Sequence, residues 1–163
     1  HGNLPPASSR PVSLTEMTQK AIEILSQHEH GFFMVVEGSQ IDWAAHGNDA
    51  DNVVRQTLLF DLAIKEAIDF ACRDKNTLVV ITADHETGGL ILQREKDNHV
   101  ADEWATKGHT AVDVPIYAFG PGSTRFSGTL DNTDIAKRIA EVLGFSHFPQ
   151  PRTTVQVPQR SGT

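Results

Sequence analysis

Short runs of apolar and β-branched residues along the chain predict the strands of a sheet. Residues 31–36 (Gly-Phe-Phe-Met-Val-Val) and residues 77–82 (Thr-Leu-Val-Val-Ile-Thr) are nearly uninterrupted, as in strands that are covered on both faces. A third run, residues 112–119, contains Pro115, which predicts a place near an edge or a bulge because proline has no N–H for a strand ladder. Residues 90–92 (Leu-Ile-Leu) predict a further short strand.

Apolar residues spaced three and four apart predict three helices around these strands. The first spans about residues 13–27 and opens with a capping box, Ser-Leu-Thr-Glu. The second spans about residues 51–73, and the third begins at Asp131 or Thr133 and ends near residue 143. The alternation of helices with strands of the buried type predicts an α/β fold, with a mostly parallel sheet flanked by helices.

The chain has the size and composition of one globular domain, with 163 residues of which 39% are hydrophobic. Residues 1–12 are rich in Pro and Ser and predict a loop, residues 13–145 form the folded part, and residues 146–163 are a Pro-containing tail. The chain opens on His1 and not on methionine, so we expect that a segment upstream is missing.

The charge balance bears on the kinds of partner. The formal net charge is −7, which disfavours nucleic acid or an anionic membrane as a partner and is compatible with bound divalent cations. No run approaches the roughly 20 apolar residues that a membrane span needs.

Side chains of the metal-binding kind follow the first predicted strand. Glu37 comes directly after it, and Asp42 and His46 follow at a spacing of four. If that stretch is helical, Asp42 and His46 lie on one face one turn apart and can hold one cation, with zinc the natural choice for this mixture of ligands. A solvated helix face or a hydrogen-bonded pair is the alternative for this stretch taken alone.

A second group of such side chains follows the strand at residues 77–82. Asp84 and His85 stand there, and Gly88 and Gly89 allow the backbone to turn tightly beside them. Because sites in α/β sheets form outside the carboxyl ends of the strands, we expect the two groups to converge. Their convergence predicts a metal site.

Three motifs, taken together, resemble the C-terminal half of the alkaline phosphatases over roughly residues 13–143. They are Phe-Met-Val-Val-Glu-Gly-x-x-Ile-Asp-x-x-x-His at residues 33–46, Thr-Ala-Asp-His-Glu-Thr-Gly-Gly at residues 82–89, and Gly-His-Thr at residues 108–110, before a Val-Pro strand. Their order and the residue types at the ligand positions agree with that family. The resemblance implies an alkaline-phosphatase-like α/β fold, of which this chain is a C-terminal fragment with its metal-binding part at residues 13–145.

The resemblance also implies a site with two Zn2+ ions and one Mg2+ ion. The ligand positions of the family fall on these residues: Asp42, His46 and His109 for the zinc that positions the attacking water, Asp84 and His85 for the zinc that activates the serine, and Glu37 for the magnesium. Trp43 would lie near the phosphate of the substrate, or serve packing alone.

The nucleophile of the family is not among the matched motifs. The resemblance implies hydrolysis of phosphate monoesters through a phosphoserine, and it places that serine in a missing N-terminal part and not at Ser39. We therefore expect the complete enzyme to be an alkaline phosphatase and this fragment alone to be inactive. The alternatives are a related phosphodiesterase or sulfatase, and a non-catalytic zinc-binding module. A homodimer and a periplasmic or secreted location are implied by the resemblance.

Overall fold

The computed structural model describes residues 11–94 and 100–149 of the chain. They belong to two compact units that divide between Thr124 and Arg125. The predicted loop at residues 1–12 and tail at residues 146–163 lie mostly outside the described residues.

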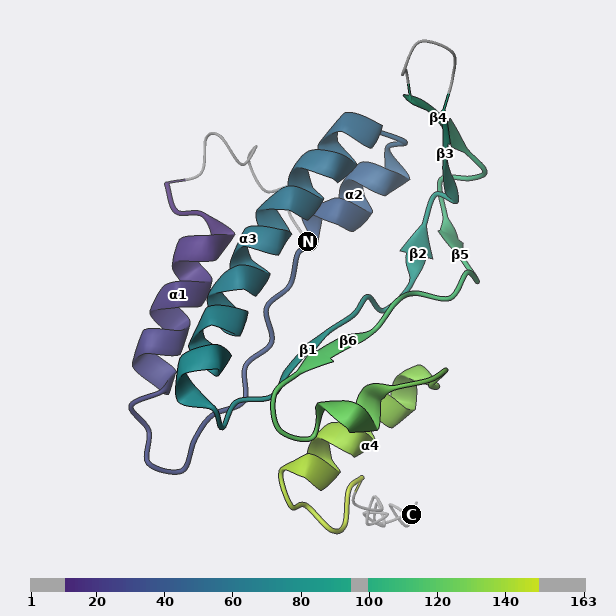
Figure 1. The fold of residues 1–163 in the computed structure, drawn as a ribbon. Helices are drawn as coiled ribbons and strands as arrows, with labels where there is room; N and C mark the ends of the chain where they lie inside the picture. The colour runs from purple at the N-terminus through teal and green to yellow at the C-terminus, as the bar shows by residue number, and fades with distance from the viewer. Residues whose placement is uncertain (1–10, 95–99, 150–163) are drawn as a thin grey trace, which may run out of the picture. The chain divides into compact units, whose positions relative to one another are not determined.

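The first unit contains three helices among its described residues; two of them match predicted helices, and the third forms where the sequence analysis considered a helix between Asp42 and His46. They are α1 (Leu14–Leu25), α2 (Gln40–His46) and α3 (Ala50–Asp74). Figure 1 shows α1 lying along α3, and α2 packed beside the first half of α3. Small side chains permit this close approach, since Ala44, Ala45 and Ala63 are buried.

The predicted capping box at the start of α1 is confirmed. The backbone N–H and the hydroxyl of Ser13 both donate to the Glu16 carboxylate at 2.8 Å, and the Glu16 N–H donates back to the hydroxyl at 3.1 Å. These two donors hold the pKa of the Glu16 carboxyl below its ordinary value of 4.5.

Removal of this cap is expected to destabilise the protein in a pH-dependent way. Ser13→Ala should lower the free energy of unfolding by about 1 kcal/mol at neutral pH. Because the pKa of Glu16 is depressed in the folded state, its contribution is present above pH 4.5 and is lost as the pH falls through the lowered value. Urea unfolding should therefore show a smaller difference between variant and wild type at a pH below the lowered pKa of Glu16 than at neutral pH. Ser26→Ala, at the other end of α1, is the control, and an equal loss at both pH values would contradict the prediction.

The described residues contain six short strands, which form three pairs. Each pair is antiparallel. The pairs are β1 (Val79–Ile81) with β6 (Tyr117–Phe119), β2 (Glu86–Thr87) with β5 (His109–Thr110), and β3 (Leu90–Arg94) with β4 (Val100–Trp104). The pairing therefore differs from the mostly parallel sheet that the sequence led us to expect: within residues 11–94 and 100–149 every strand pair is antiparallel. Apolar runs predict where strands occur, but they do not state which strands become neighbours.

The predicted strand at residues 31–36 is extended chain that pairs with no other strand among the described residues. Its side chains alternate, with Phe32 and Met34 partly covered and with Phe33 and Val35 exposed by 65% and 76%. This alternation is that of a strand with one covered face. Both its backbone edges and its second face are open to a further partner.

Helix α3 has a similar open face. Val54, Leu58 and Leu62 repeat at intervals of four residues and are all exposed. A continuous apolar stripe of this kind marks a surface that another element covers.

The second unit contains the last predicted helix. Helix α4 (Asn132–Val142) is capped by Asp131, whose side chain accepts from the Thr133 N–H. Gly144 follows with a φ of +83°, as a helix stop requires. Among the described residues no helix is both long enough and apolar enough to cross a membrane.

Candidate metal centre

Helix α2 supplies two of the predicted ligands. Asp42 and His46 are one turn apart, and the distance from Asp42 Oδ1 to His46 Nε2 is 3.4 Å. Ala44 and Ala45 of this short helix are buried, whereas the side chains of Asp42 and His46 are partly exposed. The helical condition that the sequence prediction set for this pair is met.

The β2–β5 ladder brings the third predicted ligand to the same place. His109 lies on β5 opposite Thr87 of β2, and the Gly88 N–H donates to the Gly108 carbonyl at 2.9 Å. The Glu86 carboxylate reinforces the turn, because it accepts from the Gly89 N–H at 2.9 Å and from the hydroxyl of Thr110. His109 is thus fixed by a strand that is 63 residues away from His46 in the sequence.

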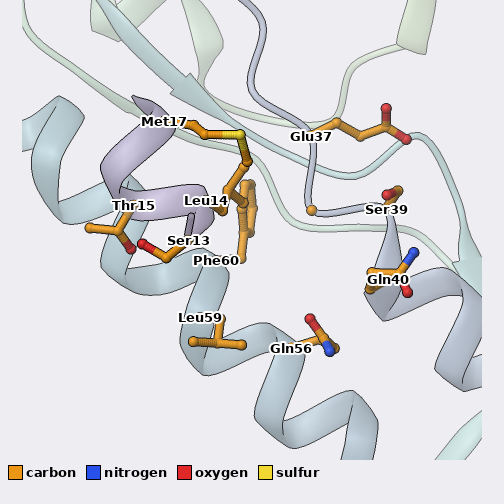
Figure 2. Close-up of a pocket in the computed structure, with 11 residues that line it drawn as sticks. Ser13, Leu14, Thr15, Met17, Glu37, Ser39, Gln40, Gln56, Leu59 and Phe60 are labelled. Carbon is orange, nitrogen blue, oxygen red and sulfur yellow. The ribbon is translucent and has the colours of Figure 1, made fainter. Parts of the chain in front are cut away.

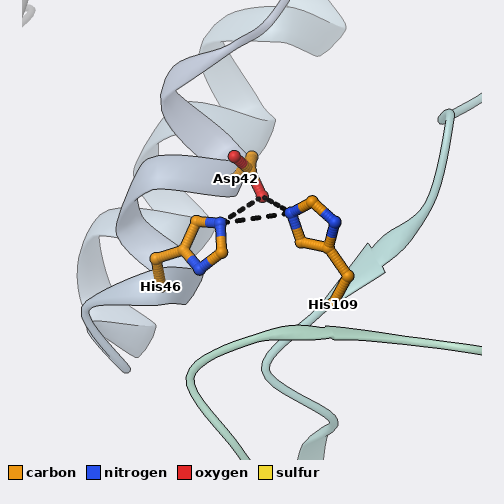
Figure 3. Close-up of side chains that lie close together, drawn as sticks. All are labelled: Asp42, His46 and His109. Atoms are coloured by element: carbon orange, nitrogen blue, oxygen red, sulfur yellow. Dashed lines mark hydrogen bonds and ion pairs between the residues drawn. The ribbon is translucent and has the colours of Figure 1, made fainter.

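The three side chains converge on one point (Figure 3). His109 Nε2 lies 3.2 Å from His46 Nε2 and 3.8 Å from Asp42 Oδ1. Ligand atoms that surround zinc tetrahedrally at 2.0–2.1 Å are about 3.3 Å from each other. The three separations, 3.2, 3.4 and 3.8 Å, are close to that value. The donor set and its spacing therefore fit a zinc ion, with a fourth position that none of the described residues fills.

A backbone carbonyl determines which nitrogen of His46 faces this point. His46 Nδ1 is hydrogen-bonded to the Lys107 carbonyl oxygen, which can only accept, so Nδ1 carries the proton. The Nε2 lone pair is then free and directed toward Asp42 and His109. Metal-binding histidines in general show this arrangement, in which the second nitrogen donates to a carbonyl or carboxylate.

Asp84 and His85 lie beside this cluster. The Asp84 Oδ2 to His85 Nε2 distance is 3.3 Å, again that of two ligands of one ion. The His85 ring stacks on the His109 ring, with 3.5 Å between their centroids and an angle of 20° between their planes. The two groups of side chains that the sequence predicted to converge are therefore neighbours.

Within the part of the chain that the structure describes, no hydrogen bond or ion pair joins the side chains of Glu37, Ser39 and Trp43 to these side chains. Glu37 and Ser39 line a cavity of about 160 Å3 between α1, α3 and the start of α2. Figure 2 shows the Glu37 side chain extending away from Leu14 and Phe60. Trp43 is 38% exposed. The magnesium role of Glu37 and the substrate role of Trp43 stay predictions.

Gly88 is required by the turn after β2. Its φ is +94°, and a Cβ at this position would lie 2.5 Å from the Trp104 indole and 3.3 Å from the Ala45 carbonyl oxygen. Gly89 also has a positive φ, +60°. Both glycines thus use the backbone freedom that the sequence analysis assigned to them, in a bend between β2 and β3.

Three contributors were not singled out from the sequence: Thr87, Glu86 and the Lys107 carbonyl. The signal for Thr87 was available, since it stands two residues after His85 and alternate residues of an extended chain share a face. No sequence signal identifies a main-chain carbonyl as a partner of His46.

The fold and the site together describe an α/β protein with a candidate metal centre, and comparisons with known proteins identify its family. The sequence profile of the alkaline phosphatases matches residues 5–102 and 92–145. Alkaline phosphatase 3 of Bacillus subtilis (strain 168) is 33% identical over 82% of this chain, and alkaline phosphatase of Escherichia coli (strain K12) is 33% identical over 81%. The chain belongs to the alkaline phosphatase family.

Comparison with solved structures leads to the same family. Alkaline phosphatase from the Antarctic bacterium TAB5 is 39% identical, with a TM-score of 0.78 over 85% of this chain. A mutant of that enzyme with magnesium bound in its M3 site has a TM-score of 0.73. These neighbours confirm the α/β, alkaline-phosphatase-like fold class, present here in part. The chain spans 45% of the B. subtilis protein, 32% of the E. coli protein and 43% of the TAB5 structure.

Proposed function

We propose that this chain is the metal-holding part of an enzyme that hydrolyses phosphate monoesters. The observation that carries the proposal is the convergence of Asp42, His46 and His109, whose ligand atoms lie within 4.8 Å of one another. Family membership supports it, because the relatives are named alkaline phosphatases.

The side chains have separate tasks in this proposal. Asp42, His46 and His109 hold one zinc ion, and Asp84 and His85 contribute to a second. Two divalent ions held by these neighbouring groups would stabilise both the entering and the leaving oxygen of an in-line displacement at phosphorus. Asp42 and Asp84 also supply negative charge, which offsets that of the ions. Glu37 would hold a magnesium ion, and Trp43 would contact the substrate.

The open fourth position favours an enzyme over a structural zinc module. Structural zinc sites have four protein ligands, whereas catalytic sites have three and leave one position for water or substrate. The side chains of His46 and His109 are 41% and 50% exposed, so the cluster is accessible to water in this structure.

We further propose that the remaining part of the enzyme supplies a serine nucleophile, which is phosphorylated during the reaction, and that it lies upstream of this chain. The chain spans less than half of the relatives it matches, which leaves room for that part. Two open apolar surfaces support such a partner: the extended residues 31–36 and the α3 stripe of Val54, Leu58 and Leu62. A homodimer and a periplasmic or secreted location belong to the same proposal.

Turnover of p-nitrophenyl phosphate tests the proposal. The complete enzyme should hydrolyse it, lose activity after treatment with a chelator, and regain activity when Zn2+ and Mg2+ are restored. The 163-residue chain alone should bind zinc without turnover. Faster hydrolysis of a phosphodiester or a sulfate ester than of the monoester would indicate a related phosphodiesterase or sulfatase and would contradict the proposal of a monoesterase.

A further inference from the structure

Thr87 occupies a central place among the predicted metal ligands. It lies on β2, directly opposite His109 in the strand register, and is only 8% exposed. Its hydroxyl is 2.6 Å from Asp42 Oδ1 and 3.2 Å from His85 Nδ1. One buried hydroxyl thus touches a predicted ligand of each zinc ion.

The directions of these two hydrogen bonds follow from chemistry. A carboxylate oxygen can only accept, so the Thr87 hydroxyl donates its single proton to Asp42. The bond to His85 must then run the other way, from the ring Nδ1–H to the Thr87 oxygen. The opposite tautomer of His85 would leave the Thr87 oxygen with two acceptors and one proton.

This arrangement prepares both groups of side chains for metal binding. With the proton on Nδ1, the Nε2 of His85 is free, and it is the atom 3.3 Å from Asp84. The Asp42 oxygen that Thr87 holds is the same oxygen that faces His46 and His109. The hydroxyl fixes this oxygen without adding a charge.

We propose that Thr87 is a positioning residue that orients Asp42 in the first predicted zinc site and fixes the tautomer of His85 in the second. The inference rests on the proposed metal-binding function of these side chains. Hydrogen-bonding partners of metal ligands typically raise metal affinity by about 10–100-fold. Because Thr87 touches both groups, its loss should weaken binding at both sites.

The test compares two substitutions at this position in the complete protein. Thr87→Val keeps the volume and β-branching and removes the hydroxyl, whereas Thr87→Ser keeps the hydroxyl. Thr18→Val is the matched control, since Thr18 is also buried and its hydroxyl donates to the Leu14 carbonyl within α1. The readouts are Zn2+ affinity from competition with a chromophoric chelator, the visible absorption spectrum of the Co2+-loaded protein, and thermal unfolding without metal.

Thr87→Val should weaken binding of both zinc ions by about 10–100-fold and change the Co2+ spectrum, while Thr87→Ser and Thr18→Val bind as the wild type does. Wild-type affinity in Thr87→Val would overturn the inference. So would equal losses in Thr87→Val, Thr87→Ser and Thr18→Val, because they would indicate a general effect on packing. Failure of the wild type itself to bind zinc would instead overturn the proposed function, so the two failures are distinguishable.

Discussion

Replacing His109 by alanine is expected to abolish tight zinc binding at the cluster of Asp42, His46 and His109. The substitution removes one of three nitrogen and oxygen atoms that lie within 4.8 Å of one another. Loss of a ligand should lower the zinc affinity by more than the roughly 100-fold expected for loss of a residue that only supports a ligand. If the complete protein is the proposed phosphomonoesterase, kcat/KM for p-nitrophenyl phosphate should fall at least about 1,000-fold, because a zinc ion held there would stabilise charge in the transition state.

The matched control for this prediction is His30→Ala. His30 is also an exposed histidine, but its side chain pairs with Glu29 outside the site. Calorimetric titration with Zn2+ should give wild-type affinity for His30→Ala and no tight binding for His109→Ala. If His109→Ala kept both its zinc and its turnover, the cluster would not be a metal centre.

Gly88→Ala is expected to have the second largest effect, although it touches no predicted ligand. The new methyl group would meet the Trp104 indole at 2.5 Å on a backbone with a φ of +94°. The turn could form only if the indole or the β2–β5 ladder moved, and that ladder carries Thr87 and His109. We expect a loss of about 2–5 kcal/mol in the free energy of unfolding, from overpacking and backbone strain combined.

Gly128→Ala separates the two causes. Gly128 has a similar φ of +82°, but a Cβ there would meet nothing within 4 Å. Its substitution by alanine should lower the free energy of unfolding only through backbone strain, by about 1–2 kcal/mol. Urea unfolding and zinc titration of both variants check the prediction: Gly88→Ala should lose stability and zinc affinity, and Gly128→Ala only a little stability. Equal losses of stability would mean that the Trp104 contact does not matter.

The local features of the fold were predictable because their causes are local in sequence. The capping box of Ser13, the Asp131 cap and the stop at Gly144 depend on neighbours within a few residues. The pairing of Asp42 with His46 also needed only a helix between them.

The position of His109 could not be predicted from its neighbours in the sequence. Nothing in the residues around it indicates a contact with a side chain 63 positions earlier, and it entered the predicted site only through resemblance to a family. The antiparallel strand pairs were missed for the same reason, since apolar runs such as residues 77–82 look alike whichever strand they pair with.

The sequence by itself therefore determined the helices, their caps, the glycine turn and the types of side chain at the site. The tertiary structure decided which strands pair, that His109 meets His46, and that the Lys107 carbonyl and the Thr87 hydroxyl set the orientation of two histidines. The physical reason is the distance along the chain over which each effect acts. Backbone propensity and capping act over a few residues. A ligand cluster instead needs segments that are distant in sequence to be packed within a few ångströms, and packing depends on the whole chain.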